Sequence, residues 1–124
     1  MKKTVLKAFN VNGEKRMLAD ILTAFPFDQS LNWSLIWFDG VVNFEGNASY
    51  DDFVEKINQS PYGVSYKTDE LLVFSKNILD IRDLVLVGYH NFPVFDKRLV
   101  IDGFYEGVEL VVELFDSTEW VIYA

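Results

Sequence analysis

The sequence predicts an α+β fold with a mainly antiparallel sheet, two helices in the N-terminal half and a C-terminal β-meander. Two stretches before residue 61 repeat apolar residues at helical spacing. After residue 70 the apolar stretches are short, rich in Val, Ile, Leu and Tyr, and bounded by turn residues or charges. The gaps between these late stretches are too short for parallel crossovers, so we expect their strands to pair antiparallel.

The chain is predicted to begin with a strand and a helix. Strand-forming residues occupy 3–9, and Asn12-Gly13 then marks a turn. From residue 14 the apolar side chains recur on one helical stripe, which predicts a first helix over 14–25. Pro26 ends it, because proline cannot continue a helix.

A hairpin and a second helix are predicted next. Asp39-Gly40 readily adopts the positive φ angles of a two-residue turn, which predicts a hairpin between strands 32–38 and 41–45. Ser49 is followed three residues later by the acid Asp52, and then by a short apolar stripe at Phe53, Val54 and Ile57. This pattern predicts an N-cap and a short helix that ends near Ser60.

The remaining chain is predicted to form strands. Apolar stretches lie at 71–74, 84–89 and 98–104. Apolar and acidic residues then alternate over 108–115, which indicates a half-buried strand. Asp116-Ser117-Thr118 is a tight turn into a last strand at 119–123, so a terminal hairpin closes the fold.

Length and composition predict a single domain, residues 1–124. A chain of this length buries a core without covalent staples, and its 50% hydrophobic content excludes a disordered chain. There are no cysteines, which excludes disulfides and thiolate metal ligands. No apolar run approaches the roughly eighteen residues of a membrane span, and no signal peptide is recognised. We therefore expect a cytoplasmic protein with no membrane association.

The charge disfavours nucleic-acid binding. Nineteen acidic and eleven basic residues give a net charge of −8, the wrong sign for holding phosphate groups. Residues 1–16 carry five bases and one acid, whereas residues 96–119 carry seven acids and two bases. The basic start is either a patch that complements the acidic end or an ordinary solvated surface. The C-terminal third is predicted to present an acidic surface.

This acidic third supplies the predicted partner-binding residues. Glu109 and Glu113 lie four residues apart on one strand and so share a face, with Val111 between them and Phe115 beyond. Carboxylates around apolar anchors suit a basic protein partner. The alternative is that the acids are only the solvated face of a half-buried sheet. The residues predicted to bind are Asp102, Tyr105, Glu106, Glu109, Glu113, Asp116, Glu119 and Trp120.

Enzymatic chemistry is not predicted. The usual nucleophile, phosphate-loop and metal motifs are missing from the sequence, so no catalytic residue, metal site or cofactor is expected. His90, the only histidine, is interpreted as a strand-end or surface residue, with general-base catalysis as the alternative. Paired acids such as Asp51 and Asp52, or Glu109 and Glu113, leave a small carboxylate-dependent enzyme as a third hypothesis.

The terminal stretch 108–124 carries a family resemblance. Its sequence, VELVVELFDSTEWVIYA, has the order acidic-apolar strand, Asp-Ser turn and aromatic strand. This order resembles the ends of small bacterial immunity proteins and of related bacterial families. The size, the acidity, the lack of cysteine and the α+β order are also similar to those proteins. The resemblance implies an inhibitor that binds and blocks a cognate toxin, often a nuclease.

The sequence therefore favours a non-enzymatic cytoplasmic binding protein, most concretely an immunity-type inhibitor that covers the basic site of a protein toxin. A self-associating structural or regulatory subunit, present as a monomer or a weak homodimer, is the second hypothesis.

Overall fold

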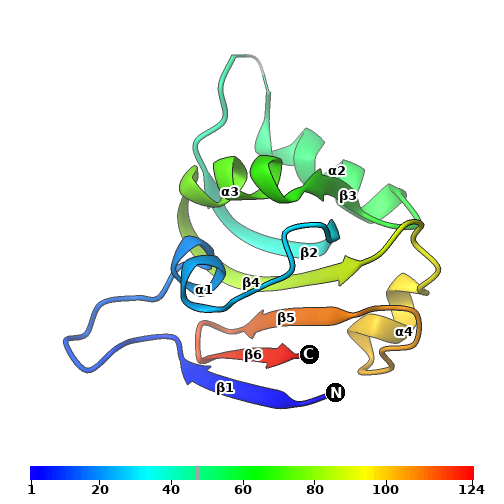
Figure 1. The fold of residues 1–124 in the computed structure, drawn as a ribbon. Coiled ribbons are helices and arrows are strands. Elements are labelled where there is room, and N and C mark those ends of the chain that lie inside the picture. The colour runs from blue at the N-terminus through cyan, green and yellow to red at the C-terminus, as the bar shows by residue number, and fades with distance from the viewer. Residues whose placement is uncertain (47) are drawn as a thin grey trace.

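The computed structural model describes residues 1–46 and 48–124, and these residues form a six-stranded antiparallel sheet with four helices. The strand order is β1-β6-β5-β4-β2-β3 (Figure 1). The strands are β1 Lys3–Lys7, β2 Asn32–Val42, β3 Val64–Lys67, β4 Ile78–Tyr89, β5 Leu110–Phe115 and β6 Glu119–Tyr123. The helices are α1 Leu18–Ala24, α2 Tyr50–Gln59, α3 Thr68–Lys76 and α4 Lys97–Ile101.

The predicted fold class and the antiparallel sheet are confirmed. Strands β4, β5 and β6 lie side by side in chain order, and β1 pairs with the outer edge of β6. In the described residues there are four helices instead of the two expected. The cap predicted for α2 is present, because the Ser49 hydroxyl accepts a hydrogen bond from the Asp52 backbone N–H.

The hairpin predicted at Asp39-Gly40 is wrong. These residues lie inside the continuous strand β2, at a β-bulge where its register against β4 shifts. Gly40 is needed there for a different reason, since a Cβ on it would collide with the backbone carbonyl of Asp80 on the neighbouring strand. The glycine marks a close approach of two strands and not a turn.

Two predicted strands are helices in the structure. Residues 71–74 lie in α3, where Leu71 and Phe74, one turn apart, are both buried against the sheet. Residues 98–104 overlap α4, which Asp96 caps by accepting hydrogen bonds from the backbone N–H groups of Arg98 and Leu99. An apolar run of four or five residues is compatible with a strand and with a helix, so periodicity alone did not distinguish the two here.

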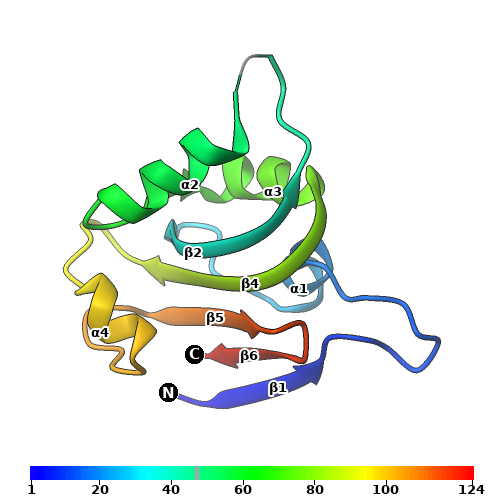
Figure 2. The same cartoon turned by 180° about the vertical axis from the view of Figure 1, so that it is seen from behind.

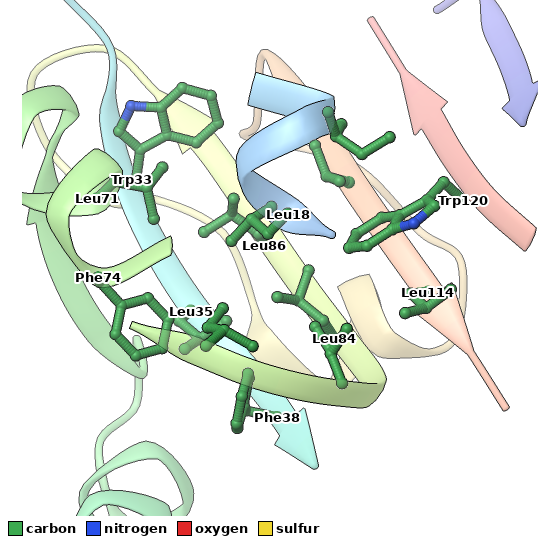
Figure 3. Packing of buried hydrophobic residues seen from close by; sticks show 14 of the residues in the cluster. Leu18, Trp33, Leu35, Phe38, Leu71, Phe74, Leu84, Leu86, Leu114 and Trp120 are labelled. Carbon is green, nitrogen blue, oxygen red and sulfur yellow. The ribbon is translucent and has the colours of Figure 1, made fainter. Parts of the chain in front are cut away.

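The two faces of the sheet are covered unequally. Helices α1 and α3 cover the first face, and side chains of α2 pack against the same core. Figure 3 shows part of this larger core. The second face is covered only toward one end, by α4 and its flanking loops. Seen from behind in Figure 2, α4 lies in front of the sheet and α1 lies beyond it. The core under α4 contains Ile36, Val85, Val87, Tyr89, Phe95, Val100 and Val111.

Among the described residues, no helix has the length and apolar character that a membrane crossing requires.

Candidate protein-binding surface

The face of the terminal hairpin that was predicted to bind a partner is the second face of the sheet. Along β5, the side chains on this face change from fully buried Val111 through Glu113, which is 7% exposed, to exposed Phe115. Glu119 stands opposite Phe115 on β6 and is also exposed. The gradient arises because the α4 region covers the end of the sheet where β5 begins. The predicted face is therefore only partly open.

The expectation that Glu113 is exposed is wrong. Its Oε1 accepts a hydrogen bond from the Tyr105 hydroxyl at 2.9 Å, so Tyr105 lies over it. Burial raises the pKa of the Glu113 carboxyl, although the Tyr105 hydrogen bond and the charge of Lys3 act in the opposite direction. The Tyr105 and Tyr123 rings lie 4.7 Å apart between their centroids. Glu113 ties the loop after α4 to the sheet and is not a surface carboxylate.

Trp120 is also removed from the predicted surface. It lies on the first face of the sheet with 0% exposure, beside Leu114 and the residues of α1 (Figure 3). Its indole Nε1 donates a hydrogen bond of 2.9 Å to the backbone carbonyl of Arg16. Alternation along β6 puts Trp120 on the face opposite to Glu119. Trp120 is a core residue and does not contact a partner directly.

Asp116 and Glu119 lie at the other end of the hairpin. The length of β5 separates this end from α4 by roughly 17 Å, at about 3.3 Å per residue. Asp116 Oδ1 lies 3.3 Å from Nε of Arg82, and Glu119 stands opposite Lys7 in the β1–β6 register. Basic side chains therefore neighbour both acids, and neither belongs to the surface near α4.

The other predicted residues come together around α4. Asp102, Glu106 and Glu109 are exposed there, and Tyr105 is half-buried among them. Three apolar side chains lie exposed in the same region: Val94 at 74%, Leu99 at 49% and Phe104 at 62%. We call Asp102, Glu106, Glu109, Val94, Leu99 and Phe104 the α4 surface. A shallow groove of about 260 Å³ crosses it, lined by Val94, Asp96, Leu99, Phe104 and Glu106.

The carboxylates of this region lack basic partners. Within residues 1–46 and 48–124, no ion pair closer than 4.0 Å involves Asp96, Asp102, Glu106 or Glu109. By contrast, Asp80 near the far end of the sheet lies 2.9 Å from the Lys15 ammonium, which lowers the pKa of the Asp80 carboxyl. Within the part of the chain that the structure describes, no ion pair therefore neutralises these carboxylates.

Two bases lie beside this surface in sequence. Arg98 is exposed and forms no ion pair within 4.0 Å in the described residues, and the ammonium of Lys97 is bound elsewhere. Its Nζ donates hydrogen bonds to the backbone carbonyls of Ile57, Asn58 and Ser60, at 2.6, 3.1 and 3.1 Å. These carbonyls lie at the C-terminus of α2, where the helix dipole favours a cation. Partial burial lowers the pKa of Lys97. The contact fixes α4 to α2 and engages the Lys97 ammonium away from the carboxylates of the α4 surface.

Leu99 and Phe104 were missed because residues 98–104 were interpreted as a strand. The sequence does contain a helix signal, because the acid Asp96 stands directly before this segment, where an N-cap residue is expected. Read as an N-cap, it would have predicted a helix and placed Leu99 on a different face from buried Val100.

His90 follows β4 and is exposed, as interpreted from the sequence. Its Nε2 lies 3.7 Å from Oδ2 of Asp28, and both side chains face solvent. Of the acid pairs in the enzyme hypothesis, Glu109 and Glu113 do not converge, because Glu109 is exposed before β5 and Glu113 is covered by Tyr105.

Comparison of the chain with models of protein families, with curated proteins and with solved structures finds no match. A functional assignment therefore depends on the chemistry of the α4 surface.

Glu113 gives a pH-dependent prediction. We expect Glu113→Gln to raise the melting temperature at pH 7, because Gln retains an oxygen for the Tyr105 hydroxyl and removes a buried charge. Burial places the pKa of the Glu113 carboxyl in the folded state above its ordinary value of 4.5. In the wild-type protein, the stability contributed by the protonated Glu113 carboxyl is therefore fully present below about pH 4.5. It is lost as pH rises through the folded-state pKa.

Thermal unfolding followed by circular dichroism across this pH range measures the effect. The gain in melting temperature should grow from acidic to neutral pH, and the exposed control Glu109→Gln should show no such trend. A Glu113→Gln protein less stable than wild type at pH 7 would show that Lys3 and Tyr105 outweigh the cost of burial.

Proposed function

We propose that this chain is a non-enzymatic protein-binding module whose α4 surface holds a basic protein, most concretely as an immunity-type inhibitor covering the basic site of a toxin such as a nuclease. The proposal places this action in the cytoplasm. The observation that carries it is the exposure of Val94, Leu99 and Phe104 among carboxylates that form no ion pair within the described residues.

The two kinds of side chain have different roles in this proposal. Apolar side chains at the centre of an interface supply most of the affinity when they are desolvated against a partner. Carboxylates at the rim raise the association rate with a cationic surface and disfavour acidic competitors. An inhibitor of a protein that binds nucleic acid needs such a surface, because the site it covers is basic. The family resemblance of residues 108–124 supports the same function.

The test is capture of a partner from a lysate of the source organism by the immobilised chain. The variant Asp102→Asn/Glu106→Gln/Glu109→Gln should bind the partner roughly tenfold more weakly at low salt, because it loses electrostatic steering. The matched control Glu14→Gln/Glu45→Gln/Glu55→Gln removes the same charge from exposed positions outside the α4 surface and should bind as wild type does.

The captured protein is then purified, and its affinity and its own activity are measured with each variant. A basic protein that wild type inhibits, with a salt-sensitive affinity that only the α4 variant loses, supports the proposal. Equal loss in both triple variants would contradict a specific α4 surface. Retention of only the chain itself would favour the self-association hypothesis instead.

A further inference from the structure

We propose that the groove on the α4 surface receives one arginine side chain of the basic partner. This inference rests on the proposed function and names the group that the site recognises. In it, the arginine stem lies between Val94 and Leu99, and its guanidinium stacks on the Phe104 ring beside Asp96 and Glu106. These five residues line the groove.

The size of the groove favours a single side chain. Its volume of about 260 Å³ lies below the roughly 300–1,000 Å³ of sites for drug-sized ligands. Its three apolar residues offer a long alkyl stem a contact that a bare cation would not use.

The charge of the groove favours a cationic occupant. Asp96 uses Oδ1 to accept the backbone N–H groups of Arg98 and Leu99, and a carboxylate keeps further acceptor sites beyond these two bonds. Glu106 has no basic partner within the described residues. Of the two neighbouring bases, Lys97 is bound to the end of α2 and Arg98 does not line the groove, so neither fills it from within the chain.

Arginine fits this combination better than lysine does. A guanidinium is planar, is more weakly hydrated than an ammonium, and stacks on an aromatic face while it donates hydrogen bonds in its own plane. Phe104 supplies an exposed ring, and Asp96 and Glu106 supply carboxylates at the same groove. A lysine ammonium would meet the same charge but would gain less from the ring and would lose more hydration.

The test uses short capped peptides that differ at one position: Gly-Arg-Gly, Gly-Lys-Gly and Gly-citrulline-Gly. Citrulline has nearly the shape of arginine but carries no charge. Each peptide is titrated at millimolar concentration into isotopically labelled protein, and the NMR shifts are followed. The arginine peptide should shift Leu99, Phe104 and Glu106 in a saturable way, with an affinity at least threefold above that of either other peptide.

Two variants separate the groove from the rest of the region. Phe104→Ala should abolish the preference for arginine over lysine, and Glu106→Gln should weaken the arginine peptide severalfold. Phe92→Ala removes an exposed phenylalanine that does not line the groove and should bind as wild type does.

The outcomes distinguish this inference from the proposed function. Equal affinity for the arginine and lysine peptides, or shifts away from the groove, would overturn the arginine site. Lysate capture that depends on the α4 carboxylates would still support the binding function in that case. A selective arginine peptide site without any protein captured would support the inference about the groove and count against the inhibitor function.

Discussion

Replacing Trp120 with alanine is expected to destabilise the fold by about 3–5 kcal/mol, the usual cost of removing a large aromatic side chain from a core. Trp120 is fully buried between the sheet and α1, so its removal leaves a cavity there. It also removes the indole donor to the Arg16 carbonyl. Urea unfolding followed by circular dichroism measures the loss, which corresponds to a fall in melting temperature of roughly 10 °C or more.

The matched control is Trp37→Ala on the second face of the sheet. Trp37 is 43% exposed, so the same change in residue type should cost much less there. Trp120→Phe should be intermediate, because it preserves most of the apolar contact and loses the hydrogen bond. Similar stability for the Trp120→Ala and Trp37→Ala proteins would contradict the assignment of Trp120 to the core. If the Trp120→Ala protein remained folded but lost partner binding selectively, Trp120 would instead belong to the binding surface.

The terminal hairpin and the α2 cap were predictable because each depends on neighbouring residues. Alternation over 108–115 and a turn at residues 116–118 specify two paired strands whatever the rest of the chain does. Ser49 caps α2 through the N–H of Asp52, only three residues away. Local chemistry of this kind can be recognised from the sequence, since the partners are fixed by chain connectivity.

The segments that failed depend on distant partners. Gly40 is selected by the carbonyl of Asp80, which is forty residues later in the chain, so the Asp-Gly pair did not specify a turn. Residues 71–74 form a helix because Leu71 and Phe74 then both reach the first face of the sheet. The sequence predicted which residues are apolar, but the sheet determined which structure buries them.

The candidate site shows the same division. Alternation correctly put Glu113, Phe115 and Glu119 on one face of the hairpin, because the register is local. It carried no information about what covers that face, and the α4 region buries Glu113 while it leaves Phe115 exposed. Composition then identified an acidic third of the chain, and the tertiary structure separated it into a paired end and an unpaired α4 surface.

Gly63→Ala is the second substitution with a large expected effect, about 2–4 kcal/mol. Gly63 lies in the turn between α2 and β3 with φ of +70°, a conformation that costs alanine about 1 kcal/mol. A Cβ there would also collide with the backbone carbonyl of Leu35 on β2. Since β2 is held between β3 and β4, it cannot move away without breaking strand pairing, and overpacking adds roughly 1–3 kcal/mol.

Gly13→Ala isolates the part of this cost that comes from φ. Gly13 has φ of +79°, but nothing lies within 4 Å of its added Cβ, so we expect a loss of only about 1 kcal/mol in the same urea experiment. Equal losses in both variants would show that Leu35 yields to the new methyl group. The Gly63 turn follows the α2 carbonyls that bind Lys97, so a displaced turn should also shift the NMR resonances of Leu99 and Phe104, whereas Gly13→Ala should leave them unchanged.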